Sequence, residues 1–254
     1  MPLPTPGGAP STSWAGTWPE LLPLQMTTNS HRGPLRTLLA FAPYLLVSAA
    51  YLVVTALGQS ATAVAIKPAL MPALLLALLL CWPWRAGRWL VLVLAVLEVV
   101  FAWIGDVVLA DPGSSGFLLG LAAFFLAHLM GLTLYLGPLR RRRIPWITAL
   151  LLLWWGALLV VLLPHLGALL IPVALYGLVL GGAAAAAWGV NRWVGLGALS
   201  FLGSDTVLAL RMFLPEFSLW QHSTILMTLY LLGQGLIVYG VLRAARSCVS
   251  AVAP

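Results

Sequence analysis

The sequence contains few charged residues and almost no cysteine. Only 7% of its 254 residues are Asp, Glu, Lys or Arg, whereas soluble domains carry about 25%. The two cysteines, Cys81 and Cys248, lie far apart and outside any Cys-x-x-Cys pattern, which argues against a disulfide framework and a cysteine metal site. With 62% hydrophobic residues and a mean hydropathy of +1.03, the chain has more apolar surface than a water-soluble fold can bury. We therefore expect an integral membrane protein.

The motifs of soluble enzymes are also missing. The sequence has no Gly-x-Ser-x-Gly motif, no P-loop, no His-Glu-x-x-His motif and no dinucleotide fingerprint between a strand and a helix. The net charge of +7 does not indicate a nucleic-acid partner, because the arginines stand in short gaps between apolar runs instead of on a basic face with interleaved aromatic residues. No cofactor, metal ion or nucleic acid is therefore expected.

Long apolar runs predict the fold class. A transmembrane helix needs about 20 apolar residues. The stretches that satisfy this lie at residues 37–57, 62–82, 88–110, 116–136, 144–163, 166–187, 193–213 and 220–242. A tight turn is expected at Pro164 and His165, between the fifth and sixth stretches. The prediction is an all-α polytopic membrane protein with about eight transmembrane helices.

The arginines predict how the chain is oriented. With eight spans, only Arg211 falls in a gap on the side opposite to the other arginines. By the positive-inside rule, both termini of this multi-pass protein then lie on the cytoplasmic side of the cell membrane. The run Arg140–Arg143 is interpreted as part of this orientation signal, with binding of anionic lipid as the alternative.

Composition also predicts three segments. Residues 1–35 are rich in Pro, Ser, Thr and Gly and lack the pattern of a signal peptide, so we expect a disordered cytoplasmic tail, with Met26 as an alternative start. Residues 36–243 form the predicted eight-helix membrane domain, and residues 244–254 a short cytoplasmic tail.

One short repeat suggests an internal duplication. The third span contains Gly105-Asp106-Val107-Val108-Leu109-Ala110, and the seventh contains Ser204-Asp205-Thr206-Val207-Leu208-Ala209. Both spans run outward, so two parallel four-helix halves would place the two Asp residues on equivalent helices. Chance similarity between Val- and Leu-rich helices is the alternative.

A few polar residues stand within the apolar spans. Each ionisable group in the middle of a bilayer costs about 2.5–3.5 kcal/mol on insertion scales, so such groups are candidates for function. They are Lys67, Glu98, Asp106, His128 and Asp205, joined in the last span by the uncharged Tyr230 and Gln234. Depths estimated at about 1.5 Å per residue place Lys67, Asp106 and Asp205 in the outer half of the membrane. A structural ion pair with Lys67 is the alternative to a catalytic role for the two carboxylates, and hydrogen-bonded packing is the alternative for His128.

Several motifs follow one another in the order and spacing of a known family. They are Ile66-Lys67-Pro68, Ile104-Gly105-Asp106-Val107-Val108-Leu109, Phe117-Leu118-Leu119-Gly120 with Phe124 and Ala127-His128, Gly197-Ala198-Leu199-Ser200-Phe201 with Ser204-Asp205, and Tyr230 with Gln234. Over about residues 40–242 the chain resembles the YhhN-like lysoplasmalogenase family of integral membrane hydrolases. It departs from the family pattern at Ala102, where a Ser is common, at Gly131, where an aromatic residue is expected, and at Glu98, which is not part of the pattern.

The resemblance implies an activity and a site. The implied reaction is hydrolysis of the vinyl-ether bond of lysoplasmalogens to a fatty aldehyde and glycerophosphoethanolamine or glycerophosphocholine. Asp106 and Asp205 would be the acid–base pair, in either order, as paired carboxyl groups act on the related cation of glycoside hydrolysis. Lys67, His128, Tyr230 and Gln234 would bind substrate or water, and the partners would be the lysophospholipid and membrane lipids.

Two readings from other classes stay open. Intramembrane Asp, Glu, His and Lys also form the proton relays of transporters, and Pro68, Pro72 and Pro172 interrupt helices at corresponding positions of the two halves. A proton-coupled small-molecule transporter is therefore one alternative, and a non-catalytic lipid-binding protein is the other.

Overall fold

The computed structural model describes residues 32–84, 87–110 and 114–247, and within these ranges all regular structure is helical. The side chains of residues 32–34 and 114–115 are outside the description. The predicted N-terminal tail lies outside the described residues up to residue 31, as does the end of the C-terminal tail from residue 248. The helices are α1 (Arg32–Ala56), α2 (Ser60–Ile66), η1 (Lys67–Ala69), α3 (Leu70–Cys81), α4 (Trp89–Val108), α5 (Ser114–Leu136), η3 (Trp146–Ala149), α6 (Leu150–Leu166), η4 (Gly167–Leu169), α7 (Leu170–Ala187), α8 (Arg192–Phe213) and α9 (His222–Ser247).

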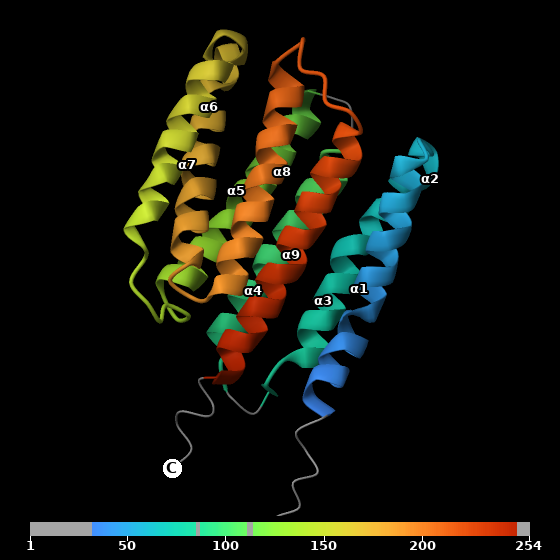
Figure 1. Ribbon diagram of the computed structural model, residues 1–254, viewed down its shortest axis with the longest axis vertical. Helices are drawn as coiled ribbons and strands as arrows, with labels where there is room; N and C mark the ends of the chain where they lie inside the picture. The colour runs from blue at the N-terminus through green and yellow to red at the C-terminus, as the bar shows by residue number, and fades with distance from the viewer. Residues whose placement is uncertain (1–31, 85–86, 111–113, 248–254) are drawn as a thin grey trace, which may run out of the picture.

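Seven helical segments of this part of the chain are long and apolar enough to cross a membrane, and one of them crosses it twice. That segment, Trp146–Ala187, has 42 residues, about 63 Å of helix against a hydrocarbon core of about 30 Å. It folds back on itself, because Trp155 Nε1 in α6 donates a hydrogen bond to the Ala174 carbonyl in α7 at 3.0 Å. Figure 1 shows α6 and α7 side by side, joined at one end of the bundle. The described residues therefore make eight passes, as predicted.

The turn between α6 and α7 lies later than the sequence predicts. Pro164 and His165 both belong to the last turn of α6, and the chain reverses at Gly167. Gly167 has a φ of +49°, a conformation that glycine adopts without a steric penalty from a side chain. The tight turn predicted around Pro164 and His165 is therefore present, and its reversal lies about three residues later, at Gly167.

The second span is built from α2, η1 and α3 instead of one regular helix. The 3₁₀ segment η1 places Pro68 at its start, where the missing N–H of proline does no harm. The helix α7, in the sixth predicted span, repeats this pattern 100 positions later: η4 occupies residues 167–169, α7 begins at Leu170, and Pro172 stands where α3 has Pro72. A 3₁₀ segment before an α-helix at matching positions is a second point of correspondence between the two predicted halves.

The two tightest helix pairs are α4 with α5 and α8 with α9. In the second pair the backbones touch: a Cβ at Gly197 would stand 2.8 Å from the Gly233 carbonyl, and a Cβ at Gly233 would stand 2.9 Å from the Gly197 carbonyl. In the first pair a Cβ at Gly105 would meet the ring of Phe124 at 2.7 Å. Small residues that let helices approach closely are the usual basis of packing in lipid, where the hydrophobic effect between helices is absent.

Both described ends of the chain lie at the same end of the bundle. Arg246 near the end of α9 donates to Thr37 Oγ1 in α1 at 3.2 Å, and Figure 1 shows both ends at the bottom of the view. Arginines from two of the predicted inner gaps lie there as well, since Arg88 donates to the Pro138 carbonyl at 3.0 Å and Arg141 to the Ala244 carbonyl at 2.6 Å. Arg85 lies outside the described residues. The helix α9 continues to Ser247, four residues beyond residue 243, where the predicted membrane domain ends.

Candidate functional site

The first carboxyl group of the site is held by a cation and a hydroxyl group. Asp106 is 5% exposed and lies in the last turn of α4. Its Oδ1 is 3.2 Å from Lys67 Nζ, at the start of η1, and its Oδ2 accepts a hydrogen bond of 2.6 Å from the Tyr230 hydroxyl in α9. Because η1 directs Lys67 at the end of α4, three different spans meet at this carboxylate. Lys67 keeps 20% of its side chain exposed, so the ion pair has an open side.

A second tyrosine stabilises the helix that carries Tyr230. The Tyr44 hydroxyl in α1 donates to the Leu231 carbonyl in α9 at 2.6 Å, and Tyr44 is 2% exposed. Its ring packs against Gly235, where a Cβ would be only 3.1 Å away. Tyr44 therefore fixes α1 against α9 one residue beyond the hydrogen bond from Tyr230 to Asp106.

The second carboxyl group is held by neutral groups. Asp205 lies in α8 and accepts a hydrogen bond at Oδ2 from the Tyr176 hydroxyl in α7. The same hydroxyl is 3.3 Å from Nε2 of His128 in α5, which is 8% exposed. The Tyr176 oxygen thus stands between a carboxyl group and an imidazole. A hydroxyl in this position can accept a proton from one neighbour and donate one to the other.

Aromatic rings connect the two carboxyl groups. The ring of Phe201 in α8 is 5.3 Å from the ring of Tyr230 and 4.8 Å from the imidazole of His128, both edge to face. The ring of Phe124 in α5 is 6.1 Å from Phe201 and 6.2 Å from Tyr230. Asp106 and Asp205 are near enough for their charges to interact. The result is one continuous site with an apolar centre and a carboxyl group on each side.

The site lies in the half of the bundle away from the arginines. Asp106 is two residues from the end of α4, and Asp205 is eight residues, about 12 Å, from the end of α8. Tyr230 is eight residues from the start of α9, at a matching depth. This is the half, away from the arginines, in which the sequence prediction places these groups.

The structure brings together most of the predicted site residues, with two differences. Lys67, Asp106 and Tyr230 are in direct contact, whereas Asp205 is bound by Tyr176 and not by Lys67. Gln234 hydrogen-bonds neither carboxyl group: it is 3% exposed, its Oε1 has no hydrogen-bond partner, and it lines a small cavity together with His128 and Phe201. Its predicted role, a hydrogen bond to substrate or water, stays a prediction.

Glu98 forms the second polar cluster of the bundle interior. It is 7% exposed, and its Oε1 accepts a hydrogen bond of 2.5 Å from the Tyr135 hydroxyl in α5. A cavity of about 20 Å³ adjoins Glu98, His128 and Gln234, which is room for about one water molecule. This cavity places the unpartnered Gln234 oxygen, the carboxyl group of Glu98 and the imidazole of His128 around one volume.

Two departures from the family pattern explain each other. A Cβ at Gly131 would stand 2.8 Å from Glu98 Oε1 and 3.2 Å from the Tyr135 hydroxyl. An aromatic residue at position 131 would therefore occupy the space that the Glu98 carboxyl group needs. In this chain, the absence of a side chain at Gly131 leaves room for the carboxyl group of Glu98.

Tyr176 and Tyr135 are the site residues that sequence reasoning missed. Tyr135 is buried and Tyr176 is partly buried, and each hydrogen-bonds a carboxyl group across helices. A signal was present, because a buried tyrosine hydroxyl needs a hydrogen-bond partner and few partners exist in these spans. Among the described residues, no three His, Cys, Asp or Glu side chains gather as metal ligands do.

Comparisons with known proteins agree with the resemblance seen in the sequence. The family description that matches is the YhhN family, over residues 62–241. No curated protein and no solved structure matches the chain. The matched region contains both carboxyl groups of the site together with Lys67, His128, Tyr176 and Tyr230. Because it covers more than half of the sequence, the chain belongs to the YhhN family.

Proposed function

We propose that the protein is a membrane-embedded lysoplasmalogenase that hydrolyses the vinyl-ether bond of lysoplasmalogens. The observation that supports this most is a pair of carboxyl groups in unlike settings on facing sides of one site. Asp106 stands beside a cation, and Asp205 stands beside a tyrosine and a histidine. Family membership is compatible with a hydrolase.

The unlike settings suggest how the two carboxyl groups divide the reaction. Lys67 compensates one negative charge at Asp106, so Asp106 serves as the ionised carboxylate. Asp205 has no cation among its partners and contacts a hydroxyl group, so it serves as the neutral acid. The same division of labour, one neutral and one ionised carboxyl group, is used in glycoside hydrolysis.

The proposed reaction then has three steps. Asp205 donates its proton to the β-carbon of the vinyl ether, and the double bond becomes an oxocarbenium ion whose positive charge is stabilised by Asp106. Water attacks the α-carbon and gives a proton to the Asp205 carboxylate, which restores the acid and leaves a hemiacetal. The hemiacetal then breaks its bond to the glycerol oxygen, which takes up the hydroxyl proton, and the aldehyde leaves.

The surroundings of Asp205 suit an apolar chain. Asp205 borders a cavity of about 40 Å³ whose other walls are mainly apolar and include Trp155, Leu158 and Leu180. Much of α6 faces outward, with Leu152, Leu153 and Val160 at least 60% exposed. An alkenyl chain can therefore reach Asp205 from the lipid by displacing α6, while Lys67, at the partly open side of Asp106, binds the phosphate.

The proposed location is the cell membrane, with both termini in the cytoplasm. The support is the positive-inside rule together with the gathering of arginines at the end of the bundle where both described chain ends lie. The site would then open towards the outer leaflet.

The experiment that tests the proposal measures aldehyde release by the purified protein. Lysoplasmenylethanolamine is the substrate, and acyl lysophosphatidylethanolamine, which lacks the vinyl ether, is the control. The expected result is aldehyde from the first lipid only, lost in both Asp106→Asn and Asp205→Asn and kept in Glu98→Gln, with thermal unfolding showing that all four proteins are folded at the assay temperature. Full activity in either Asp variant contradicts the role proposed for that residue, and no aldehyde from the unaltered protein contradicts the function.

A proton-coupled transporter is the second candidate, and one observation favours it. The 3₁₀ segments η1 and η4 interrupt equivalent spans at equivalent positions, and η1 carries Lys67 into the site. Interrupted helices at matching positions of two halves are typical of transporters. However, η4 forms a turn at the end of a span and not a break within one. Substrate-dependent proton flux in liposomes without product favours the transporter, whereas neither flux nor product favours a lipid-binding protein.

A further inference from the structure

A large hollow of the described bundle has one end far from the two carboxyl groups. It is a groove of about 1310 Å³ between α1 on one side and α8 and α9 on the other. Its walls are apolar over most of their length and include Phe41, Leu45, Leu232 and Leu236. The groove is open to the surroundings of the bundle, and neither Asp106 nor Asp205 lines it.

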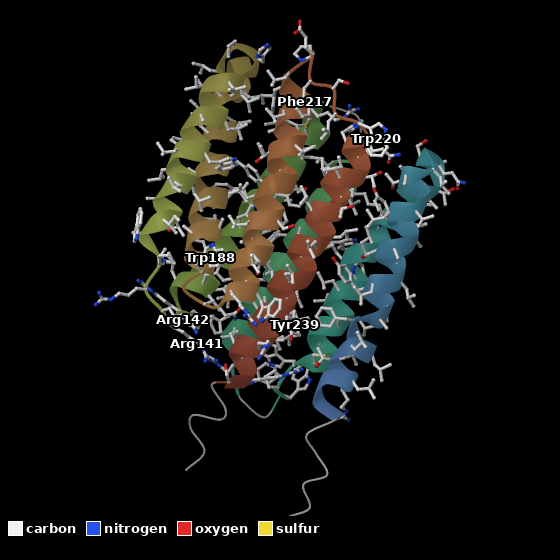
Figure 2. The ribbon with its side chains drawn as sticks, viewed as in Figure 1. Arg141, Arg142, Trp188, Phe217, Trp220 and Tyr239 are labelled. Atoms are coloured by element: carbon white, nitrogen blue, oxygen red, sulfur yellow. The ribbon has the colours of Figure 1, made fainter. Side chains whose placement is uncertain are left out.

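Arginines surround one end of this groove. Its lining includes Arg141 and Arg142 from the segment after α5, Arg192 from α8, and Arg243 and Arg246 from α9. None of the described residues that line it is acidic. Figure 2 shows Arg141, Arg142 and Tyr239 near the end of the bundle where the chain ends lie, away from Phe217 and Trp220. The groove therefore has a cationic mouth at one membrane interface and an apolar interior.

The arginine side chains at the mouth are held in place by contacts with the rest of the bundle. Arg141 donates to the Ala244 carbonyl at 2.6 Å, and Arg246 donates to the Cys81 carbonyl at 2.9 Å. The guanidinium groups of Arg192 and Arg243 lie 4.9 and 5.9 Å from the ring centres of Trp193 and Tyr239. The rings orient Arg192 and Arg243 without cancelling their charge, and each of these guanidinium groups has five donors for an anion.

The length of the groove fits the chain of a lipid from one leaflet. On α9 its lining extends from Thr228 to Ser247, and the part between Arg243 and Thr228 covers 15 residues, or about 22 Å. One leaflet contributes about half of a hydrocarbon core of about 30 Å. An acyl chain that starts at the arginines can therefore lie along the groove for its whole length.

From this charge and length we propose that the groove binds an anionic phospholipid. Its phosphate lies among Arg142, Arg192 and Arg243 at the mouth, and one acyl chain lies between α1 and α9. The lipid fills the space between α1 and the pair α8 and α9, and it holds them together. It comes from the leaflet at the arginine-rich end of the bundle.

This site is distinct from the proposed catalytic site. Tyr230, which binds Asp106, is 13 residues from Arg243 on α9, or about 20 Å along the helix. In a lysoplasmalogen the vinyl ether is only a few bonds from the phosphate. A lipid with its phosphate at these arginines cannot place a vinyl ether at Asp106, so the inference does not depend on the proposed function.

The test compares lipid retention by matched variants of the full chain. The protein is reconstituted with equal amounts of phosphatidylglycerol and phosphatidylcholine, extracted in mild detergent and examined by native mass spectrometry. Arg192→Gln with Arg243→Gln removes two cations of the mouth. Arg140→Gln with Arg143→Gln removes the same charge from exposed positions of the same face that do not line the groove.

The expected result is selective loss in the first variant. The unaltered protein retains phosphatidylglycerol in preference to phosphatidylcholine, the mouth variant loses this retention by about tenfold or more, and the control stays within about twofold. Equal retention of the two lipids, or equal loss in both variants, overturns the proposal. Inorganic phosphate that displaces the lipid at equal concentration also overturns it, because an anion site alone then accounts for binding.

A second pair of variants tests the apolar part without removing any charge. Ala49 lines the groove on α1, whereas its neighbour Ala50 does not, and both are exposed. Ala49→Phe fills the groove and is expected to reduce phosphatidylglycerol retention several-fold, while Ala50→Phe leaves it unchanged. If both variants keep full retention, no chain lies in the groove and the proposal fails even if the arginine variants are unfolded.

Discussion

The hairpins α4–α5 and α8–α9 have the same plan, and they place their carboxyl groups in opposite surroundings. Each contains a helix that runs away from the arginine-rich end of the bundle, an Asp followed by Val, Leu and Ala on that helix, and a closely packed returning helix. Asp106 of the first hairpin contacts a cation, whereas Asp205 of the second contacts only neutral groups. The difference arises outside the hairpins, because Lys67 comes from η1 and Tyr176 from α7.

Each hairpin also supplies a partner to the other. Tyr230 of α9 binds Asp106 of α4, and His128 of α5 contacts the tyrosine that binds Asp205 of α8. Neither predicted half could form this site alone. If the halves arose by duplication, the two copies have diverged in charge while remaining joined through one site.

Loss of either carboxyl group is expected to have the largest effect. Asp106→Asn and Asp205→Asn should each reduce aldehyde release by about 10²- to 10⁴-fold, the usual contribution of a positioned acid or base. The stability of the two variants, measured by thermal unfolding in detergent, tests whether the two carboxyl groups differ in their surroundings. Asp205→Asn should leave stability nearly unchanged, whereas Asp106→Asn should lower it because Lys67 loses its partner. Equal stability loss in both variants would mean that the two settings do not differ in charge.

Removal of the cation tests the charge difference directly. Lys67→Met should lower the free energy of unfolding by about 3 kcal/mol, because a nearly buried carboxylate then has no counter-charge. The double variant Lys67→Met with Asp106→Asn should recover much of this loss, which a double-mutant cycle measures. Purely additive effects of the two substitutions would contradict the ion pair.

Glycine variants compare the packing of the two hairpins. Gly233→Ala should destabilise the protein by about 2 kcal/mol, because its Cβ meets the backbone of α8, which cannot move aside. Gly105→Ala should cost less, since the atom in the way belongs to the ring of Phe124. Gly182, with nothing within 4 Å of a Cβ, is the control, and its change to Ala should be neutral or stabilising in thermal unfolding. Equal losses at 105 and 233 would show that both pairs depend on backbone contact.

Substitution of the tyrosines should give the smallest effects. The two variants should lose a similar amount of stability but differ in their rates of aldehyde release. Tyr176→Phe and Tyr230→Phe each remove one hydrogen bond to a carboxyl group, which costs about 1 kcal/mol. Tyr176→Phe should also slow aldehyde release by about tenfold, because it separates Asp205 from His128. Tyr230→Phe should slow it less, since Lys67 still holds Asp106. The reverse order of rates would reverse the proposed roles of the two carboxyl groups.

The sequence could predict the spans because hydropathy and arginine positions report on the membrane itself. The sequence could also predict that Lys67 and Asp106 lie at a similar depth in the membrane, because depth follows from counting residues along a helix. It could not say which side of a helix faces a partner. In spans such as α6 and α7 nearly every residue is apolar, so no polar face marks the outside, and the contact of Tyr176 with Asp205 left no periodic signal. The same limit applies to Gln234, whose depth was predictable but whose side chain lines the cavity beside Glu98 and His128.

The reversal of the chain at Gly167 has a consequence for every helix that follows it. Residues 146–187 form one unbroken apolar segment in which no charged residue marks where the first pass ends. If this segment were inserted as a single pass, α8 and α9 would enter the membrane upside down, and Arg192 and Arg243 would be carried across it. Asp205 would then face the side opposite to Asp106, and the two carboxyl groups could never meet. One turn without charge thus decides whether the second half of the protein faces the same way as the first.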